Sequence, residues 1–170
     1  MPKLIRRIGF KKLVPEAQAP YQKYITDAGY DLSAVSITKT EDYIEYCTGI
    51  ALEIPTHMVG LVFPRSSVTG NDLMLKNCVG VIDSQYRGEI RCRFARIPST
   101  EFKDLVLWTE DVKKKIRGRI EIVWREDKEY KVGDRVCQIV FLTLPELMLY
   151  ETQELSITDR GDGSFGHTGK

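Results

Sequence analysis

Short segments in which apolar and polar residues alternate are the most regular feature of the chain. Residues 89–94 alternate with a period of two, and their apolar face consists of Ile90, Cys92 and Phe94. Residues 119–125 show the same period, with an apolar face of Ile120, Ile122 and Trp124. Successive side chains of a strand point to opposite faces, so both segments are predicted to be half-buried strands.

Two further segments are more continuously apolar, and turn signals separate the segments from one another. Residues 61–63 and 136–142 predict strands that are buried on both faces. Turns are indicated at residues 28–29, 55–56, 70–72, 117–118 and 132–134. Helix signals are scarce, and residues 103–115 favour a hairpin. Many short strands with regular turns predict an all-β sandwich, jelly roll or barrel.

The chain has 170 residues, which suits one domain with a real core. We expect a single β domain over residues 1–157. Residues 158–170 include four glycines and one large apolar residue, Phe165, so they cannot pack a core by themselves. This end is predicted to be a mobile segment.

Charge and composition narrow the classes of function. The 25 basic and 24 acidic residues leave a net charge of +1, which argues against a nucleic-acid surface. Any phosphate site must therefore be local. No stretch has the pattern of a signal peptide or the length of a membrane span, so a soluble, cytoplasmic protein without membrane contact is expected.

The four cysteines, Cys47, Cys78, Cys92 and Cys137, lack the spacing of zinc ligands. Residue statistics favour buried free thiols in a reducing cytosol. A regulatory or metal role is the alternative.

Two segments carry polar groups of a kind that binds phosphate or metal. Asp31 follows a small-residue turn at the start of a strand. Arg65, Ser66 and Ser67 follow a buried strand, and a guanidinium with free backbone amides at a turn can hold an anion. Alone, the first is most simply a structural turn and the second a polar loop that caps a strand.

The segment over residues 77–90 is the most informative. An apolar strand runs into Asp83-Ser84-Gln85-Tyr86 and resumes at Gly88, which predicts a hairpin with a carboxylate and an aromatic ring at its tip. Its backbone edges and the Asn77 amide suit the hydrogen-bonding edge of a nucleobase.

Two segments near the C-terminus complete the set. Gln138 interrupts an apolar strand, and a buried amide needs partners or a site to serve. Residues 160–169 combine Arg160 and Phe165 with glycines that permit close approach to phosphates. A disordered end is the simpler interpretation of this stretch.

In this order the segments AGYDLSA, PRSSVTG, GVIDSQYRGEI, GDRVCQ and RGDGSFGHTG resemble the five motifs of the trimeric dUTPase family. The resemblance covers residues 26–90 and 133–170. It implies a jelly-roll or distorted β-barrel subunit, a homotrimer with shared active sites, and hydrolysis of dUTP to dUMP and pyrophosphate. Such an activity lowers dUTP and supplies dUMP for thymidylate synthesis.

The resemblance also implies roles for individual residues. Asp83 resembles the general base for the attacking water, and Gln138 a water and phosphate contact. Tyr86 resembles the ring that packs on deoxyribose, and Asn77 with the hairpin backbone around Val81 resembles the uracil reader. The remaining substrate contacts implied are Arg65, Ser66, Ser67, Arg160, Phe165, Gly166, His167 and Thr168, the last five in a closing lid.

Magnesium is the implied cofactor, with Asp31 reaching it through water. Attack on a phosphate needs in-line geometry and charge neutralisation. Magnesium keeps most of its waters and needs only one or two carboxylates beside the substrate phosphates. A site with one such aspartate and no histidine cluster is consistent with that chemistry.

Two alternatives remain open. A dCTP deaminase of the same superfamily shares the Arg-Ser-Ser segment, although Tyr86 and the glycine-rich tail favour the pyrophosphatase. The stretch over residues 95–132 is longer than usual in the family and resembles inserts of some phage members. It is either a solvated hairpin or an arm through which nucleotide state controls a protein partner.

Overall fold

The computed structural model describes residues 7–103 and 119–163, with only the backbone described for residues 100–103 and 119–121. Eleven strands and two short 3-10 helices occur in these ranges, and no α-helix does. The all-β prediction is therefore confirmed. In the described part of the chain no helix has the length and apolar character needed to cross a membrane.

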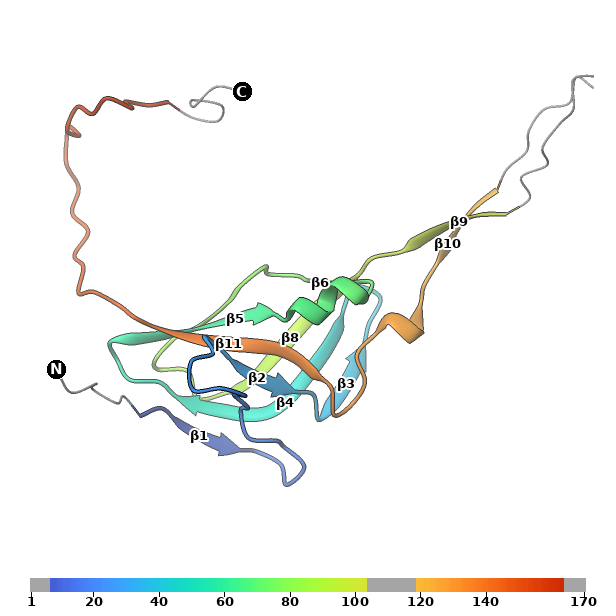
Figure 1. The fold of residues 1–170 in the computed structure, drawn as a ribbon. Coiled ribbons are helices and arrows are strands. Elements are labelled where there is room, and N and C mark those ends of the chain that lie inside the picture. The colour runs from blue at the N-terminus through green and yellow to red at the C-terminus, as the bar shows by residue number, and fades with distance from the viewer. Residues whose placement is uncertain (1–6, 104–118, 164–170) are drawn as a thin grey trace, which may run out of the picture.

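A five-stranded antiparallel sheet forms one layer (Figure 1). Its order is β1-β4-β8-β6, and β3 also pairs with β4. The strands are β1 (Gly9–Lys12), β3 (Ser36–Lys39), β4 (Ile44–Glu53), β6 (Leu73–Leu75) and β8 (Glu89–Arg96).

A four-stranded antiparallel sheet of order β2-β11-β5-β7 forms the second layer. Its strands are β2 (Tyr30–Ser33), β5 (Met58–Pro64), β7 (Gly80–Ile82) and β11 (Arg135–Thr143). The short helix η1 (Ser66–Gly70) follows β5 directly. The two sheets face each other, in the manner of a jelly roll, and do not close into a barrel.

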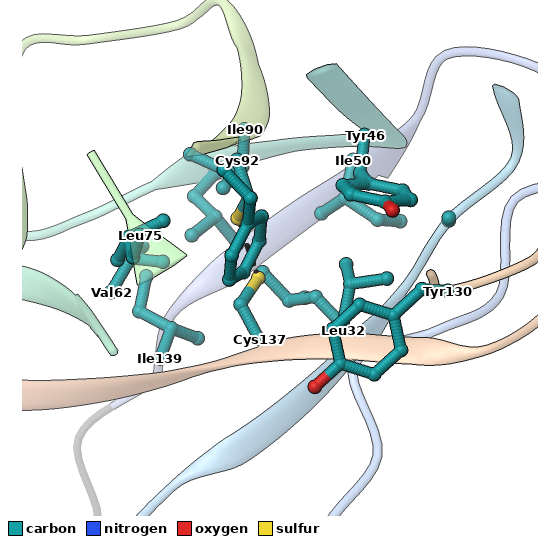
Figure 2. Close-up of a cluster of buried hydrophobic side chains, with 14 of the residues drawn as sticks. Leu32, Tyr46, Ile50, Val62, Leu75, Ile90, Cys92, Tyr130, Cys137 and Ile139 are labelled. Carbon is teal, nitrogen blue, oxygen red and sulfur yellow. Dashed lines mark hydrogen bonds between the residues drawn. The ribbon is translucent and has the colours of Figure 1, made fainter. Parts of the chain in front are cut away.

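The core lies between the two sheets (Figure 2). Ile90, Cys92 and Phe94 of β8 are each no more than 1 % exposed, as their alternation predicts. In β11 the adjacent residues Val136 and Cys137 are both fully buried. The pairing of β11 with β2 shifts register between Arg135 and Cys137, and such a bulge lets two consecutive side chains face one side.

Two of the four cysteines meet across the core. The thiol of Cys92 on β8 lies 2.8 Å from that of Cys137 on β11, sulfur to sulfur (Figure 2). All four cysteines are free thiols. The contact with Cys92, together with burial, raises the pKa of Cys137 well above its usual value, so this thiol stays protonated. The expectation of buried thiols is confirmed for this pair and is wrong for Cys78, which is exposed.

The hairpin of β9 (Ser99–Lys103) and β10 (Arg119–Val123) projects away from both layers (Figure 1). A hairpin was predicted over residues 103–115, and residues 104–118 lie outside the described ranges. The prediction of a half-buried face was wrong for Ile122 and Trp124, which are 64 % and 53 % exposed. The prediction of a strand was correct for residues 119–123, but among the described strands only β9 pairs with β10, and no other described strand joins this two-stranded sheet.

The chain returns from the hairpin through η2 (Glu126–Lys128). The next residue, Glu129, forms ion pairs with Lys39 of β3 at 2.7 Å and with Arg96 of β8 at 3.0 Å. Its carboxylate is mostly buried, and its hydrogen bond raises the pKa of Lys39. These contacts fix the base of the hairpin to the five-stranded sheet.

Candidate functional site

A cavity of about 690 Å³ opens beside the turn that joins β7 to β8. The prediction of a hairpin here was wrong, because β7 and β8 belong to different sheets and do not pair, and the turn crosses from one layer to the other. The lining of the cavity includes Asn77, Val81, Asp83 and Tyr86, so the structure brings these four predicted residues together. The strand β7 is at the edge of its sheet and pairs only with β5 in the described part of the chain. Its outer edge therefore leaves backbone groups available to a planar, hydrogen-bonding ligand.

Three carboxylates line this cavity, and two of them form ion pairs with arginine side chains. Glu45 accepts from Arg93 at 2.7 Å and faces Arg91 at 3.5 Å. Glu89 accepts from Arg91 at 2.9 Å. Asp83 is exposed, and its carboxylate has no hydrogen bond or ion pair with a described residue. It is thus the one acid in the cavity wall that is free to bind a water or a substrate.

The ring of Tyr86 is folded back onto the turn between β7 and β8. Its hydroxyl donates to the Glu89 carbonyl oxygen at 3.0 Å, and its backbone N–H donates to the Asp83 carbonyl at 3.0 Å. A Cβ at Gly88 would overlap the Tyr86 hydroxyl, so this fold-back requires glycine. The ring therefore has a defined place in the wall of the cavity.

A second polar cluster lies where β2, β5 and β11 meet. Arg65 Nε donates to Asp31 Oδ1 at 2.7 Å, and Arg135 Nη1 donates to Asp31 Oδ2 at 3.1 Å. Arg135 also lies over the ring of Tyr21. One carboxylate thus holds two guanidinium groups, and the arrangement leaves net positive charge for an anion.

The loop after β5 adds hydroxyls and backbone groups to this cluster. Ser66 and Ser67 are exposed in η1, and Arg65 Nη1 donates to Ser67 Oγ at 3.4 Å. Gln138 donates its amide to the Pro64 carbonyl at 3.1 Å. A Cβ at Gly29 would lie 3.0 Å from Gln138 Oε1, so the turn before β2 closes over this amide.

The two clusters lie at opposite ends of β5. The pairing of Gly60 with Ile82 continues toward Asp83, which lines a hollow together with Met58 and Val59. Arg65 lies six positions beyond Val59 (59 to 65), and Gln138 pairs with Phe63. At about 3.3 Å per residue, about 20 Å separates the backbone at Asp83 from that at Arg65.

The described residues hold no group of three or more potential metal ligands. Asp31, with its side chain 18 % exposed, is the carboxylate that pairs with both arginines of the second cluster. A magnesium ion that keeps its waters and arrives with phosphates needs no more than this. The residues present therefore fit a metal carried by the ligand and do not fit a resident, protein-ligated ion.

The predicted C-terminal residues are described only in part. Arg160 is exposed and donates to the Gly163 carbonyl at 3.2 Å within a turn. Phe165, Gly166, His167 and Thr168 lie outside the described residues. The segment between β11 and this turn leaves the two sheets as an extended chain (Figure 1).

Two residues in the second cluster were missed in the sequence. Arg135 was included in the GDRVCQ segment without a role, and Tyr130, whose hydroxyl oxygen lies 3.2 Å from Ser67 Oγ, was in none of the five motif segments. Their contacts depend on how β11 and the hairpin base pack against β2 and η1, and no local pattern encodes that packing. The alternating charge of Asp134-Arg135 before an apolar strand was the available signal.

Comparison with known proteins gives a consistent result. The dUTPase family model matches residues 15–103 and 97–169. A deoxyuridine 5'-triphosphate nucleotidohydrolase of Finegoldia magna is 32 % identical over 93 % of this chain and 97 % of its own length. One of Paramecium bursaria Chlorella virus 1 is 30 % identical, over 94 % and 95 %.

Solved structures agree on the fold. The dUTPase of Staphylococcus bacteriophage 80alpha with dUPNHPP matches with a TM-score of 0.74 and 24 % identity, covering 98 % of this chain and 100 % of that one. The dUTPase of phage phi11 of S. aureus, described as showing a species-specific insert, matches with a TM-score of 0.64 and 22 % identity, over 88 % and 98 %.

Proposed function

The chain belongs to the dUTPase family and is a dUTP diphosphatase that converts dUTP to dUMP. On that premise we propose that Asp83 activates a water for attack on the α-phosphate, with the nucleotide bound as its magnesium complex. The observation that carries this proposal is the unpaired Asp83 carboxylate in the cavity beside β7. A base must be free of competing partners and within reach of the water it deprotonates.

The cavity beside β7 is proposed to bind the deoxyuridine. Backbone groups at the edge of β7 around Val81, together with the Asn77 amide, read the uracil edge. Tyr86 packs against the sugar, and its fold-back over Gly88 supports a fixed wall that leaves no room for a ribose 2′-hydroxyl. A volume of about 690 Å³ is ample for a nucleoside.

The cluster around Asp31 is proposed to bind the triphosphate. Arg65, Ser66 and Ser67 donate to phosphate oxygens, and Gln138 holds a phosphate oxygen or the attacking water. Asp31 would reach magnesium through its water shell. When bound, the metal neutralises phosphate charge and orients the leaving pyrophosphate.

One chain does not hold Asp83 and Arg65 close enough to act on the same phosphate. A separation of about 20 Å exceeds the reach of both side chains, because reacting groups must lie within hydrogen-bond distance. We therefore propose a homotrimer in which one chain supplies the deoxyuridine cavity and a neighbour the phosphate cluster. A closed ring of three identical interfaces would complete every site.

The C-terminal residues are proposed to close over the bound nucleotide. Arg160, Phe165, Gly166, His167 and Thr168 would form this lid, with residues 158–170 acting separately from the β domain of residues 1–157. The extended course of the chain after β11 supports this division. Closure would exclude bulk water and add positive charge.

The substrate preference tests the proposed deoxyuridine cavity. Pyrophosphate release should be fast with dUTP and slower by about a hundredfold or more with dTTP and UTP, since a 5-methyl or a 2′-hydroxyl has no space. The measurement is steady-state phosphate release after coupling to pyrophosphatase, at equal concentrations of magnesium nucleotide. Rapid turnover of dTTP or UTP would contradict the cavity assignment, and ammonia release from dCTP would indicate the deaminase instead.

The hairpin of β9 and β10, within the longer stretch over residues 95–132, is proposed as a partner-binding arm. It projects from the sheets, and Ile122 and Trp124 stay exposed on it. A pull-down from host extract should capture a protein with the wild-type chain and lose it with the Trp124→Ala variant. Equal capture by both would refute this role.

We expect the enzyme to act in the cytoplasm, where its nucleotide substrate is found.

A further inference from the structure

Tyr130 connects the hydrophobic core to the loop that follows β5. Its side chain is buried, with the residue only 7 % exposed, and its ring packs edge-on against Tyr46 and Phe94 at centroid distances of 5.8 and 6.0 Å. Figure 2 shows this ring at the end of the core cluster. Its hydroxyl oxygen lies 3.2 Å from Ser67 Oγ. The ring of Tyr130 therefore packs in the apolar cluster, while its hydroxyl makes a polar contact with Ser67 outside that cluster.

The backbone at Tyr130 is held firmly. The preceding residue, Glu129, is paired with Lys39 and Arg96. The following strand, β11, pairs with β5 from Cys137 to Thr143. A buried ring between two such anchors has little freedom, so its hydroxyl stays at a fixed position relative to η1.

Two groups of the protein can donate a hydrogen bond to Ser67 Oγ. Arg65 Nη1 donates to Ser67 Oγ at 3.4 Å, and the Tyr130 hydroxyl can donate to the same oxygen. A serine hydroxyl has two lone pairs and one proton. When the Tyr130 hydroxyl is the donor, the protein fills both lone pairs of Ser67 Oγ, and the proton of Ser67 points outward, where a phosphate oxygen would accept it. Donors to the hydroxyl also strengthen its own donation.

We propose that Tyr130 is a positioning residue for triphosphate binding, which it supports by fixing the Ser67 hydroxyl as an outward donor. This inference rests on the proposed role of Ser67 and Arg65 in holding phosphates. The hydroxyl of Tyr130 adds nothing to core packing that a phenylalanine ring would not supply. Its contribution is therefore to the loop.

Replacing Tyr130 with phenylalanine should raise KM for dUTP between about twofold and tenfold, the range of one net hydrogen bond, with kcat nearly unchanged. A contact made equally to substrate and transition state appears in KM alone. Binding of deoxyuridine, which has no phosphate, should not change. A defect in core packing would instead lower the melting temperature. It would not raise KM selectively over kcat, and it would not weaken dUTP binding selectively over deoxyuridine binding.

The matched control is Tyr46→Phe. Tyr46 belongs to the same aromatic cluster, and its hydroxyl is buried beside the Tyr130 backbone without a hydrogen bond of good geometry. This hydroxyl does not touch η1, so KM for dUTP should stay at the wild-type value. A raised KM in this control would assign the effect of Tyr130→Phe to the cluster and overturn the inference.

A double-mutant cycle separates the inference from its premise. Ser67→Ala should raise KM, and Tyr130→Phe should add nothing further in that background. Ser67→Thr, which keeps the hydroxyl, should restore sensitivity to Tyr130→Phe. If Ser67→Ala leaves KM unchanged, the phosphate role of Ser67 fails. If Ser67→Ala raises KM but Tyr130→Phe does not, or the two effects add fully, the positioning role alone is overturned.

Discussion

Replacing Asp83 with asparagine should lower kcat about a thousandfold, the middle of the range for loss of a general base. The amide has the same shape as the carboxylate and can hydrogen-bond a water, but it cannot take its proton. Asp83 has no described partner, so its replacement should break no ion pair and leave no buried charge. The loss should therefore be confined to the chemical step.

Two measurements define the result. Single-turnover pyrophosphate release reports the chemical step, and calorimetry with a non-hydrolysable imido analogue of dUTP reports binding. The analogue should bind Asp83→Asn within about threefold of the wild-type affinity, because the replacement keeps every proposed phosphate contact. Retention of more than about a tenth of the wild-type kcat would remove Asp83 from the base role.

A second aspartate provides the control for charge. Asp127 is exposed in η2 and does not line the cavity beside β7, so Asp127→Asn removes the same charge without touching that cavity. Its kinetics should match the wild type. A comparable loss in this variant would show that net charge, and not the position of one carboxylate, governs the rate.

Strand periodicity predicted the sheets well where two layers meet. The alternation at Ile90, Cys92 and Phe94 was sufficient, because β8 has one face on the core and period two then fixes which residues are buried. The same period in β10 failed to predict the exposure of Ile122 and Trp124. A pattern reports which residues share a face, and only the tertiary arrangement decides whether anything covers that face.

The site was predictable to the extent that its parts are local. Asn77, Asp83 and Tyr86 lie within ten consecutive residues, so a single segment was enough to group them around one cavity, although the turn that carries them crosses between the two sheets and is not a hairpin. The link from Arg65 to Asp31 joins residues 34 positions apart, and that from Arg135 to Asp31 joins residues 104 apart. Such contacts follow from the pairing of β2, β11 and β5.

The second large effect is the recovery of activity when two inactive variants assemble together. It follows from the position of Asp83 and Arg65 at opposite ends of β5. A chain with Asp83→Asn keeps an intact phosphate cluster, and a chain with Arg65→Gln keeps an intact base. We propose that each active site takes Asp83 from one chain and Arg65 from a neighbour. A site between an Arg65→Gln chain, which keeps Asp83, and an Asp83→Asn chain, which keeps Arg65, can then contain both wild-type residues. In a ring of three, each interface joins two independently chosen chains.

Every trimer that contains both variants has one interface of three at which an intact Asp83 meets an intact Arg65, so purified mixed trimers should restore about one third of wild-type activity. Each variant alone should be nearly inactive, so recovery should exceed about a hundredfold over Asp83→Asn alone. The measurement is dUTP turnover by co-expressed, differently tagged chains after tandem purification, beside a mixture of separately purified variants. Mixed assemblies that are confirmed by their mass but stay inactive would place Asp83 and Arg65 in the site of one chain. That result would refute the shared arrangement.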